Sequence, residues 1–452
     1  MTPTSNRPWV KSASKLRLCQ HSTILQPRPS KAFPAWQSSD RCEQHQKPKV
    51  HSAMPKISAD RLLSDLHELR RIGEYKTGVH RPSLSTEDIA SRHWLVDKLT
   101  QAGLKAQIDG IANVYGWDPS PGRKILMGSH IETQPHGGWL DGAMGILYGL
   151  EAARTLGRGI DVAAWFDEEG WFGSFLGSRS FCGKVTDAEI DSATRRGDGV
   201  PLRTALDEAG WGSAKRVQCD AARYLGYLEA HIEQGAELAL SGDRIGIVTA
   251  IVGSHRFRIL FEGVQNHAGT TRMARRKDAG VALVRLATAI NDRFAALGNE
   301  RTVWTTGQIS IEPGSPSIVP GKGEMVFQFR DTDPELLAKL GIELNALVAE
   351  AAEGPCKVTL VTTGITTPAA MDLRFQDALE ASAVTHAPGK SQRMPSGAGH
   401  DAQILAGIMP SGMLFVPSID GVSHHYSEDT KDEDLVLGCQ VFVDAAAALL
   451  GG

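Results

Sequence analysis

The segment from Lys124 to Gly149 constrains the fold more than any other part of the chain. It opens with the apolar run 125–127, which is typical of a short buried strand, and the polar residue His130 follows. After a loop broken by Pro135, an apolar helical pattern begins at Asp141. In open α/β sheets, sites form where strands end and helices begin. The pattern predicts a divalent metal site or, more simply, a loop histidine and an N-capping carboxylate.

Length and composition limit the class of protein. A chain of 452 residues exceeds one ordinary core, so two domains are expected. A net charge of -4 gives no indication of a nucleic-acid partner, and the absence of long apolar runs indicates no membrane partner. The six cysteines form no CxxC pair, so a reduced, cytoplasmic location is expected.

Residues 1–54 differ in composition from the rest. No acidic residue precedes Asp40, while Lys, Arg, Ser, Pro and Gln are frequent. Such a segment is typical of organelle targeting, of a disordered tail, or of sequence upstream of a true start. An ordinary domain pattern begins after Met54, which favours a disordered extension or a mis-set start over targeting.

Two further predicted strands also end in polar side chains. Residues 161–166 lead into Glu168 and Glu169, and residues 224–230 lead into His231. Neighbouring carboxylates repel each other unless a cation or a proton lies between them. One of them can ligate a metal while the other acts as a general base. An acidic surface turn is the alternative, but the position directly after the first strand–loop–helix unit favours a functional site.

A second, smaller domain is predicted at residues 244–363, inserted into a first domain made of residues 55–243 and 364–452. Its order of elements, β-α-β-β-α-β, is the ferredoxin-like split βαβ. His267 and Arg330 are its possible site residues, although either one alone is more typical of an ordinary surface position. The predicted elements are strands at 255–261, 303–311, 324–329 and 357–362 and helices at 278–297 and 334–352.

The first domain therefore offers a set of imidazoles and carboxylates at strand ends or in adjoining loops. Two such sets sharing one aspartate would make a centre with two ions about 3.5–4 Å apart. The candidate ligands are His130, Asp141, Glu169, His231 and either His424 or His425.

Several motifs occur together in one order from about residue 60 to the C-terminus. They are GSHIETQPHGGWLDG, FDEEG with GSRSFCG, HIEQG, FEGVQNHAGTTRM, PSGAGHDA and GVSHHYSED. In these motifs the chain resembles the N-carbamoyl-L-amino-acid hydrolase and allantoate amidohydrolase family of dinuclear-metal, peptidase-like amidohydrolases. HIEQG and NHAGTT favour this family over the aminopeptidases. The resemblance implies an α/β fold in which a mixed-sheet, dinuclear-metal hydrolase domain carries an inserted ferredoxin-like lid and dimerisation domain.

The resemblance also implies a metal centre and a general base. Two divalent ions are expected, zinc or manganese, with cobalt or nickel as further candidates. His424 is preferred to His425 because it keeps the family's Ser-His-xxx-Glu spacing to Glu428. Glu168 would be the general base. One ion would be held by His130, His231 and bridging Asp141, and the other by Asp141, Glu169 and His424.

Substrate contacts follow from the same resemblance. Arg330 would grip a substrate carboxylate, and Gln234, Ser317 and Gly397 would line the substrate site. His267 would reach from the inserted domain into the partner subunit's site of a homodimer and stabilise the oxyanion.

Three positions depart from the family pattern. Glu132 stands in place of the usual Asp, where it would orient the first ligand histidine. Arg272 replaces a Pro, and Ser317 replaces an Asn that usually helps to hold the substrate carboxylate. The implied activity is hydrolysis of a linear carbamoyl or ureido C–N bond in an N-carbamoyl amino acid or related acid. The alternatives are hydrolysis of an N-acyl amino acid or other amide and, more remotely, an inactive binding or scaffold dimer.

Overall fold

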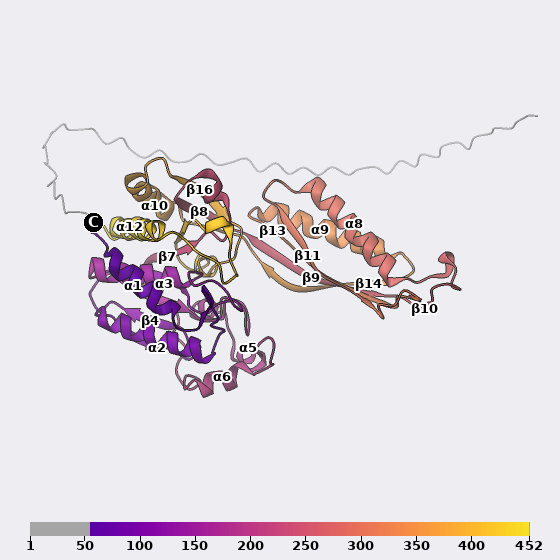
Figure 1. Cartoon of the computed structure of the whole chain (residues 1–452), viewed down its shortest axis with the longest axis horizontal. Helices are drawn as coiled ribbons and strands as arrows, with labels where there is room; N and C mark the ends of the chain where they lie inside the picture. Colours follow the sequence, from indigo (N-terminus) through magenta and orange to yellow (C-terminus); the bar gives the residue numbers. More distant parts are fainter. Residues whose placement is uncertain (1–54, 452) are drawn as a thin grey trace, which may run out of the picture. The chain divides into compact units, whose positions relative to one another are not determined.

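Two sheets organise the computed structural model, which describes residues 55–451; the predicted extension at residues 1–54 lies outside this range. The larger sheet has nine strands in the order β15-β8-β17-β7-β5-β6-β4-β3, with β16 paired to β8 (Figure 1). Its strands are β3 (Lys105–Ile108), β4 (Val114–Trp117), β5 (Lys124–His130), β6 (Ile160–Trp165), β7 (Tyr224–Ile232), β8 (Ile245–Ile251), β15 (Ala369–Ala370), β16 (Ser391–Ser396) and β17 (Ser411–Val416).

The sheet is mixed, as predicted for this fold class. Strands β17, β7, β5 and β6 are parallel, whereas β4 joins β6 and β8 joins β17 in antiparallel fashion. The parallel strands are buried on both faces, which explains why β5 is buried along its whole length and opens with a continuous apolar run, 125–127, rather than an alternating pattern. Ile125 and Met127 pack in one core cluster and Leu126 packs in another.

Helices cover both faces of this sheet. One layer, which includes the core residues Leu66, Leu147 and Phe442, consists of α1 (Ala59–Arg70), α2 (Thr86–Gln101), α3 (Ala143–Leu156), α10 (Leu373–His386) and α12 (Asp432–Leu449). Shorter helices pack on the other face: α4 (Leu176–Phe181), α7 (Glu237–Ser241) and α11 (Asp401–Leu405). The remaining short elements are β1 (Glu74–Tyr75), β2 (Gly78–Val79), α5 (Asp187–Ser192), α6 (Leu202–Glu208), η1 (Ala221–Arg223) and η3 (Ile419–Gly421).

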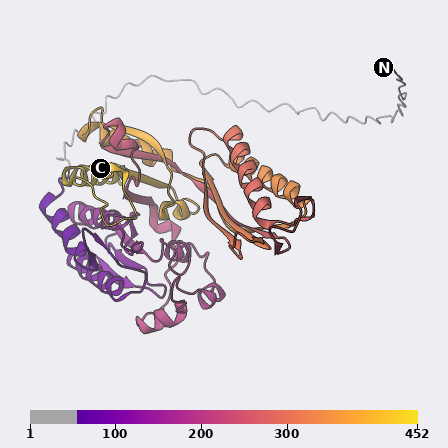
Figure 2. The same cartoon turned by 45° about the vertical axis from the view of Figure 1, so that its right-hand side comes forward.

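The second sheet has four antiparallel strands in the order β11-β13-β9-β14. Its helices α8 and α9 lie on one face, around a core that includes Phe257, Leu283 and Leu340 (Figures 1 and 2). The chain order gives the βαββαβ pattern. The elements are β9 (Gly253–Glu262), α8 (Ala279–Leu297), β11 (Val303–Glu312), β13 (Lys322–Asp331), α9 (Pro334–Ala352) and β14 (Lys357–Thr366), with β10 (Asn266–His267), η2 (Met273–Arg275) and β12 (Ile318–Val319) beside them.

The structure differs from the sequence-based expectation in both sheets and at the start of α3. Strands β8 and β16 were not predicted, and both belong to the nine-stranded sheet. The first strand of the four-stranded sheet, predicted at residues 255–261, is β9 (Gly253–Glu262), and only Val252 separates it from β8. Helix α3 begins at Ala143 rather than at Asp141, since Gly142 adopts a positive φ of 68° just before it.

No helix within residues 55–451 has the length and apolar composition that a membrane crossing requires.

Candidate metal centre

Parallel strands bring the predicted ligands to one edge of the nine-stranded sheet. His130 is the last residue of β5, and His231 lies one residue before the end of β7. Glu168 and Glu169 follow the end of β6, and His424 lies in the loop after β17. These segments are far apart in sequence but share this edge because their strands run in the same direction.

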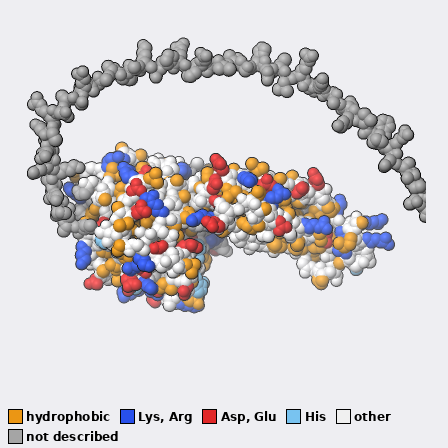
Figure 3. All heavy atoms as spheres, turned by 90° about the horizontal axis from the view of Figure 1, so that it is seen from above, with side chains coloured by type: hydrophobic (Ala, Val, Ile, Leu, Met, Phe, Trp, Pro, Cys, Tyr) orange, Lys and Arg blue, Asp and Glu red, His pale blue; other side chains and the backbone are white. Residues whose placement is uncertain are grey.

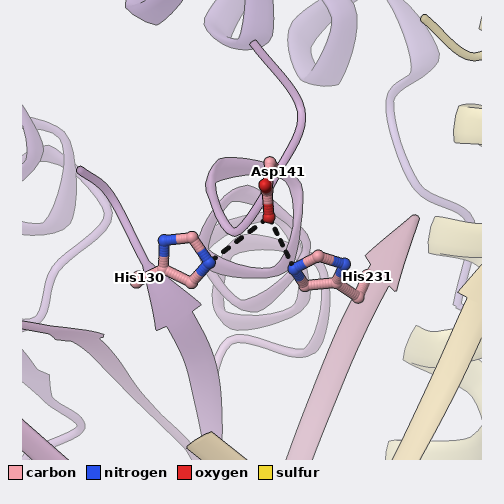
Figure 4. A group of neighbouring side chains, drawn as sticks. All are labelled: His130, Asp141 and His231. Atoms are coloured by element: carbon pink, nitrogen blue, oxygen red, sulfur yellow. Dashed lines mark ion pairs between the residues drawn. The ribbon is translucent and has the colours of Figure 1, made fainter. Parts of the chain in front are cut away.

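Asp141 lies between two imidazoles that come from neighbouring strands (Figure 4). Its Oδ1 atom is 3.4 Å from His130 Nε2 and 3.1 Å from His231 Nε2. The three residues form a buried group whose ligand atoms all lie within 4.8 Å of one another. Two imidazoles and one carboxylate are a donor set that zinc and related divalent ions bind.

The second oxygen of Asp141 faces a second group. Asp141 Oδ2 is 3.4 Å from His424 Nε2, and Glu169 Oε1 is 3.9 Å from the same nitrogen. The candidate ligand atoms of Asp141, Glu169 and His424 likewise all lie within 4.8 Å of one another. One carboxylate thus faces two His–carboxylate groups, which is the arrangement that a bridging ligand requires.

Glu168 lies beside these groups. Its Oε2 atom is 3.9 Å from His130 Nε2, and it forms a further candidate group with His130 and Glu169. Its backbone N–H donates to Glu132 Oε1 at 2.7 Å, which fixes the main chain at this position. A carboxylate held next to a metal site, but not needed to complete either set, is placed to exchange protons.

Backbone carbonyls orient the ligand imidazoles. His130 Nδ1 is 3.0 Å from the carbonyl oxygen of Glu132, and His231 Nδ1 is 2.8 Å from that of Ile232. Because a carbonyl can only accept, each Nδ1 donates, and the neutral ring keeps the lone pair of Nε2 for a metal.

Glu428 holds two of the ligand-bearing loops together. Its Oε1 accepts from the backbone N–H of Asp141 at 3.1 Å, and its Oε2 accepts from Ser423 Oγ at 2.8 Å and from the N–H of His424 at 3.3 Å. A Cβ at Gly142 would lie 2.5 Å from the His130 ring, so only glycine fits beside this ligand.

The side chain of Glu132 does not make the contact predicted for it. Its carboxylate is 3.9 Å from His130 Nδ1, too far for a hydrogen bond, and only its backbone carbonyl contacts the imidazole. The extra methylene carries the carboxylate to Arg92, where Oε2 accepts from Nη2 at 2.9 Å, and to the N–H of Glu168. The side chain of Glu132 thus positions Glu168, whereas its backbone carbonyl orients the imidazole.

The residues present fit a pair of divalent ions. Glu169 Oε1 is buried without a hydrogen-bond partner among residues 55–451, although it faces the centre. A buried, unsatisfied carboxylate oxygen is costly, and a cation removes that cost.

The pKa values of the carboxyl groups at the centre also favour the binding of cations. Burial opposes ionisation of Asp141, yet the three neighbouring imidazoles hold the pKa of its carboxyl well below the usual range. Burial raises the pKa of Glu168 well above its usual range, while the nearby His130 opposes this rise. The pKa of Glu169 is raised by burial and then by Asp141. Three carboxylates so close together in a dry site favour the binding of cations.

The predicted substrate contacts are only partly brought together. Gln234 Nε2 donates to Asp141 Oδ2 at 3.2 Å, and Arg330 Nη1 donates to the Gly397 carbonyl at 3.2 Å. A cavity of about 520 Å³ is lined by the candidate ligands, by Gln234 and by Arg330.

His267 and Ser317 do not line this cavity. They lie side by side on the β10–β12 ladder, where the N–H of Ala268 donates to the Ser317 carbonyl at 2.9 Å. Of the two adjacent candidate histidines, His424 faces the carboxylates. His425 is exposed instead, and its Nδ1 lies 2.7 Å from Ser427 Oγ.

Sequence reasoning missed two polar residues at the centre. Gln134 Nε2 donates to Glu169 Oε2 at 2.6 Å, and Arg196 Nη2 donates to Gln134 Oε1 at 2.6 Å. The guanidinium of Arg196 lies 4.4 Å from the centre of the Trp171 ring. Gln134 follows β5 in the same loop as the first ligands, and that position was the available signal; nothing local marks Arg196.

A mixed α/β sheet with paired His–carboxylate groups at the ends of its parallel strands defines a hydrolase-like α/β fold with a candidate two-ion centre. The chain belongs to peptidase family M20/M25/M40, whose model matches residues 126–448.

Individual relatives show which members of this family the chain is similar to. The chain is 32% identical to an N-carbamoyl-L-amino-acid amidohydrolase of Paenarthrobacter aurescens, covering 88% of this chain and 99% of that protein. It is also 32% identical to an allantoate amidohydrolase of Bacillus subtilis, covering 81% and 92%. The crystal structure of an amidase of the hydantoinase/carbamoylase family from Burkholderia phymatum matches with 47% identity and a TM-score of 0.81, covering 88% and 99%. The resemblance predicted from the motifs is confirmed.

Proposed function

We propose that this protein is a metal-dependent amidohydrolase that cleaves a linear carbamoyl or ureido C–N bond of an N-carbamoyl amino acid or a related ureido acid. The observation that carries this proposal is the sharing of Asp141 between two His–carboxylate groups, with Glu168 left over beside them. The names of the relatives, an N-carbamoyl-L-amino-acid amidohydrolase and an allantoate amidohydrolase, support the substrate class.

Two divalent ions are the cofactors in this proposal, with zinc or manganese as the first candidates and cobalt or nickel as others. When bound, the ions supply Lewis acidity, which activates water and polarises the scissile carbonyl. One ion is assigned to His130, Asp141 and His231, and the other to Asp141, Glu169 and His424.

Glu168 is assigned the proton transfers. Its carboxylate takes a proton from the attacking water and later delivers it to the leaving nitrogen. For a carbamoyl substrate, water adds to the carbamoyl carbon and the C–N bond to the amino acid breaks, which releases the amino acid and carbamate. The carbamate then decomposes to carbon dioxide and ammonia. Arg330 is assigned to the substrate carboxylate, since a guanidinium matches that group with two parallel hydrogen bonds.

His267 is assigned to the oxyanion in the site of a partner subunit. Within its own chain it is exposed on β10, and its Nδ1 accepts the backbone N–H groups of Gly269 and Thr270 at 3.0 and 3.2 Å. A neutral ring held in this way carries its proton on Nε2, which therefore points outward as a donor. Stabilising a developing oxyanion requires such a donor.

The inserted domain is assigned to dimerisation. Strand β11 is an edge strand of the four-stranded sheet and exposes Val303 and Ile309, while α8 exposes Val284. An exposed apolar edge strand is suited to pairing with a second copy. Figure 3 shows Lys and Arg side chains gathered at one end of the visible surface. Arg272 and Arg275, beside and in η2, are exposed.

Ammonia release from metal-loaded and chelator-treated protein tests the proposal. The substrates are N-carbamoyl-α-amino acids, N-carbamoyl-β-alanine, allantoate and N-acyl amino acids. Metal-dependent release from a carbamoyl or ureido compound is the expected result. Cleavage of only an N-acyl compound would favour the amidase alternative, and ligand binding without any metal would favour an inactive dimer.

A further inference from the structure

The open face of the four-stranded sheet carries two arginines that have no carboxylate partner in the described part of the chain. Arg256 on β9 and Arg330 on β13 both line the cavity of the metal centre, and neither forms an ion pair with any residue in the range 55–451. By contrast Arg258, two residues further along β9, forms an ion pair with Glu324 through Nε and Oε1 at 2.7 Å. The cavity thus contains cationic charge that the protein itself leaves unneutralised.

The strand register places these two guanidinium groups side by side. Arg256 is the Cα partner of Gln328, and Arg330 is the Cα partner of Ser254, so the arginines are diagonal neighbours on the same face. Such neighbours have Cα atoms about 7–8 Å apart. Burial, and then the charge of Arg256, lower the pKa of Arg330, as expected for two cations facing one space.

A buried hydroxyl lies beside both arginines, since Ser254 is the Cα partner of Arg330 and precedes Arg256 by two residues on β9. Ser254 is 5% exposed, lines the same cavity, and its Oγ has no hydrogen-bond partner in the described part of the chain. Its backbone is already satisfied, because its N–H donates to Thr366 Oγ1 at 3.0 Å. A buried hydroxyl without a partner is costly, and an anion brought by a ligand would satisfy it.

One carboxylate does not use all of these groups. The guanidinium of a single arginine pairs with both oxygens of one carboxylate through two parallel hydrogen bonds, and the proposed function assigns Arg330 to that task. Arg330 is also held in place by the Gly397 carbonyl, whereas Arg256 has no side-chain hydrogen bond within residues 55–451. Arg256 and Ser254 therefore remain available for a second acidic group.

We infer that Arg256 and Ser254 form a subsite for a second carboxylate, so that the preferred substrate is a dicarboxylic N-carbamoyl amino acid. This inference rests on the proposed function, because it extends the carboxylate site of Arg330. The substrate's carbamoyl group faces the metal ligands, and its two carboxylates face the four-stranded sheet. A short side chain matches the spacing of the two diagonal neighbours.

The test compares substrates that differ only in charge. The probes are racemic N-carbamoyl-aspartate with N-carbamoyl-asparagine, and racemic N-carbamoyl-glutamate with N-carbamoyl-glutamine. For at least one pair, the metal-loaded enzyme is expected to show a kcat/KM about tenfold to a hundredfold higher for the acid, as for a charge-assisted hydrogen bond. An acid-to-amide ratio near one in both pairs overturns the inference and leaves the proposed function standing.

Variants assign the preference to the subsite. R256Q is expected to lower the acid-to-amide ratio by about tenfold or more, and S254A by about threefold to tenfold. R258Q, on the same face of the same strand, is the matched control and should leave the ratio unchanged. An unchanged ratio in R256Q would show that Arg256 holds no second carboxylate.

A different outcome separates the two proposals. If no carbamoyl compound is cleaved, titration calorimetry of the same probes with metal-loaded protein decides the matter. Tighter binding of the acid that is lost in R256Q retains the subsite and removes the reaction class. Equal binding of acid and amide overturns the subsite as well.

Discussion

The adjacent residues Glu168 and Glu169 should respond in opposite ways to the same substitution. E168Q is expected to keep both ions and lose turnover, because Glu168 is not needed to complete either His–carboxylate set around Asp141. E169Q is expected to lose an ion, because only Glu169 and His424 accompany Asp141 in the second group. Glutamine has nearly the size of glutamate, so each variant changes charge and basicity rather than packing.

The size of the effect in E168Q follows from its surroundings. The N–H of Glu168 donates to Glu132 Oε1 at 2.7 Å, so the main chain should stay in place and only the proton acceptor is lost. Removing a general base lowers the rate about 10²–10⁴-fold, which corresponds to about 3–5 kcal/mol of transition-state free energy. The loss should appear in kcat and not in KM alone.

The assay measures metal content after dialysis and ammonia release for both variants. E353Q, at an exposed position after α9, is the matched control and should equal the wild type in both measurements. The assignment is refuted if E168Q loses an ion while E169Q retains both, since the roles would then be exchanged. Turnover by E168Q above about one tenth of the wild-type rate would refute its role as base.

Three further predictions concern other parts of the chain. Mixing H267A with E168Q protein should give activity above the sum of the two parents, because one site of a mixed dimer keeps both groups; no gain would contradict the contribution in trans. E132Q should lower the free energy of unfolding in urea by about 3 kcal/mol, since glutamine has one acceptor oxygen where Glu132 uses two, so either buried Arg92 or the N–H of Glu168 loses its acceptor; a change below about 1 kcal/mol would contradict this. Burial opposes ionisation of Asp118, but hydrogen bonds from a buried lysine and other donors outweigh burial and lower the pKa of its carboxyl. The ionised carboxylate therefore stabilises the fold fully above the unfolded-state pKa of about 4, and this stabilisation is lost progressively as the pH falls below that value. The stability gap between wild type and D118N should therefore narrow as pH falls below about 4, and a constant gap would refute this assignment.

The sequence was sufficient to predict the location of the centre. His130, Glu169 and His231 each follow an apolar run that is typical of a buried strand, and parallel strands place their ends at one edge. The alternation of residues 255–261 likewise predicted a strand, which is β9. These features depend on local periodicity, which a single sequence contains.

Contacts between distant segments could not be predicted in this way. Whether the Glu132 side chain contacts the imidazole or Arg92 depends on how helix α2, which carries Arg92 40 residues earlier in the chain, packs against it. The hydrogen bond from Gln134 to Glu169 depends on how two loops meet. Strand β8 is mostly apolar, and next to the alternating β9 it gave no separate signal.

The cavity is lined by carboxylates on one side and by arginines on the other, and this charge distribution couples metal binding to substrate binding. One wall holds Asp141, Glu168 and Glu169, which repel an anionic substrate while no cation is bound. The other wall holds Arg256 and Arg330, which attract it. Bound cations reverse the sign of the first wall, so both walls then attract the substrate, and the gain grows with each carboxylate that the substrate carries. Because such coupling is reciprocal, an acidic substrate should also retain the ions more firmly than a neutral one. The carbamoyl group, the uncharged end of the molecule, remains the part that can approach the carboxylates closely enough to react.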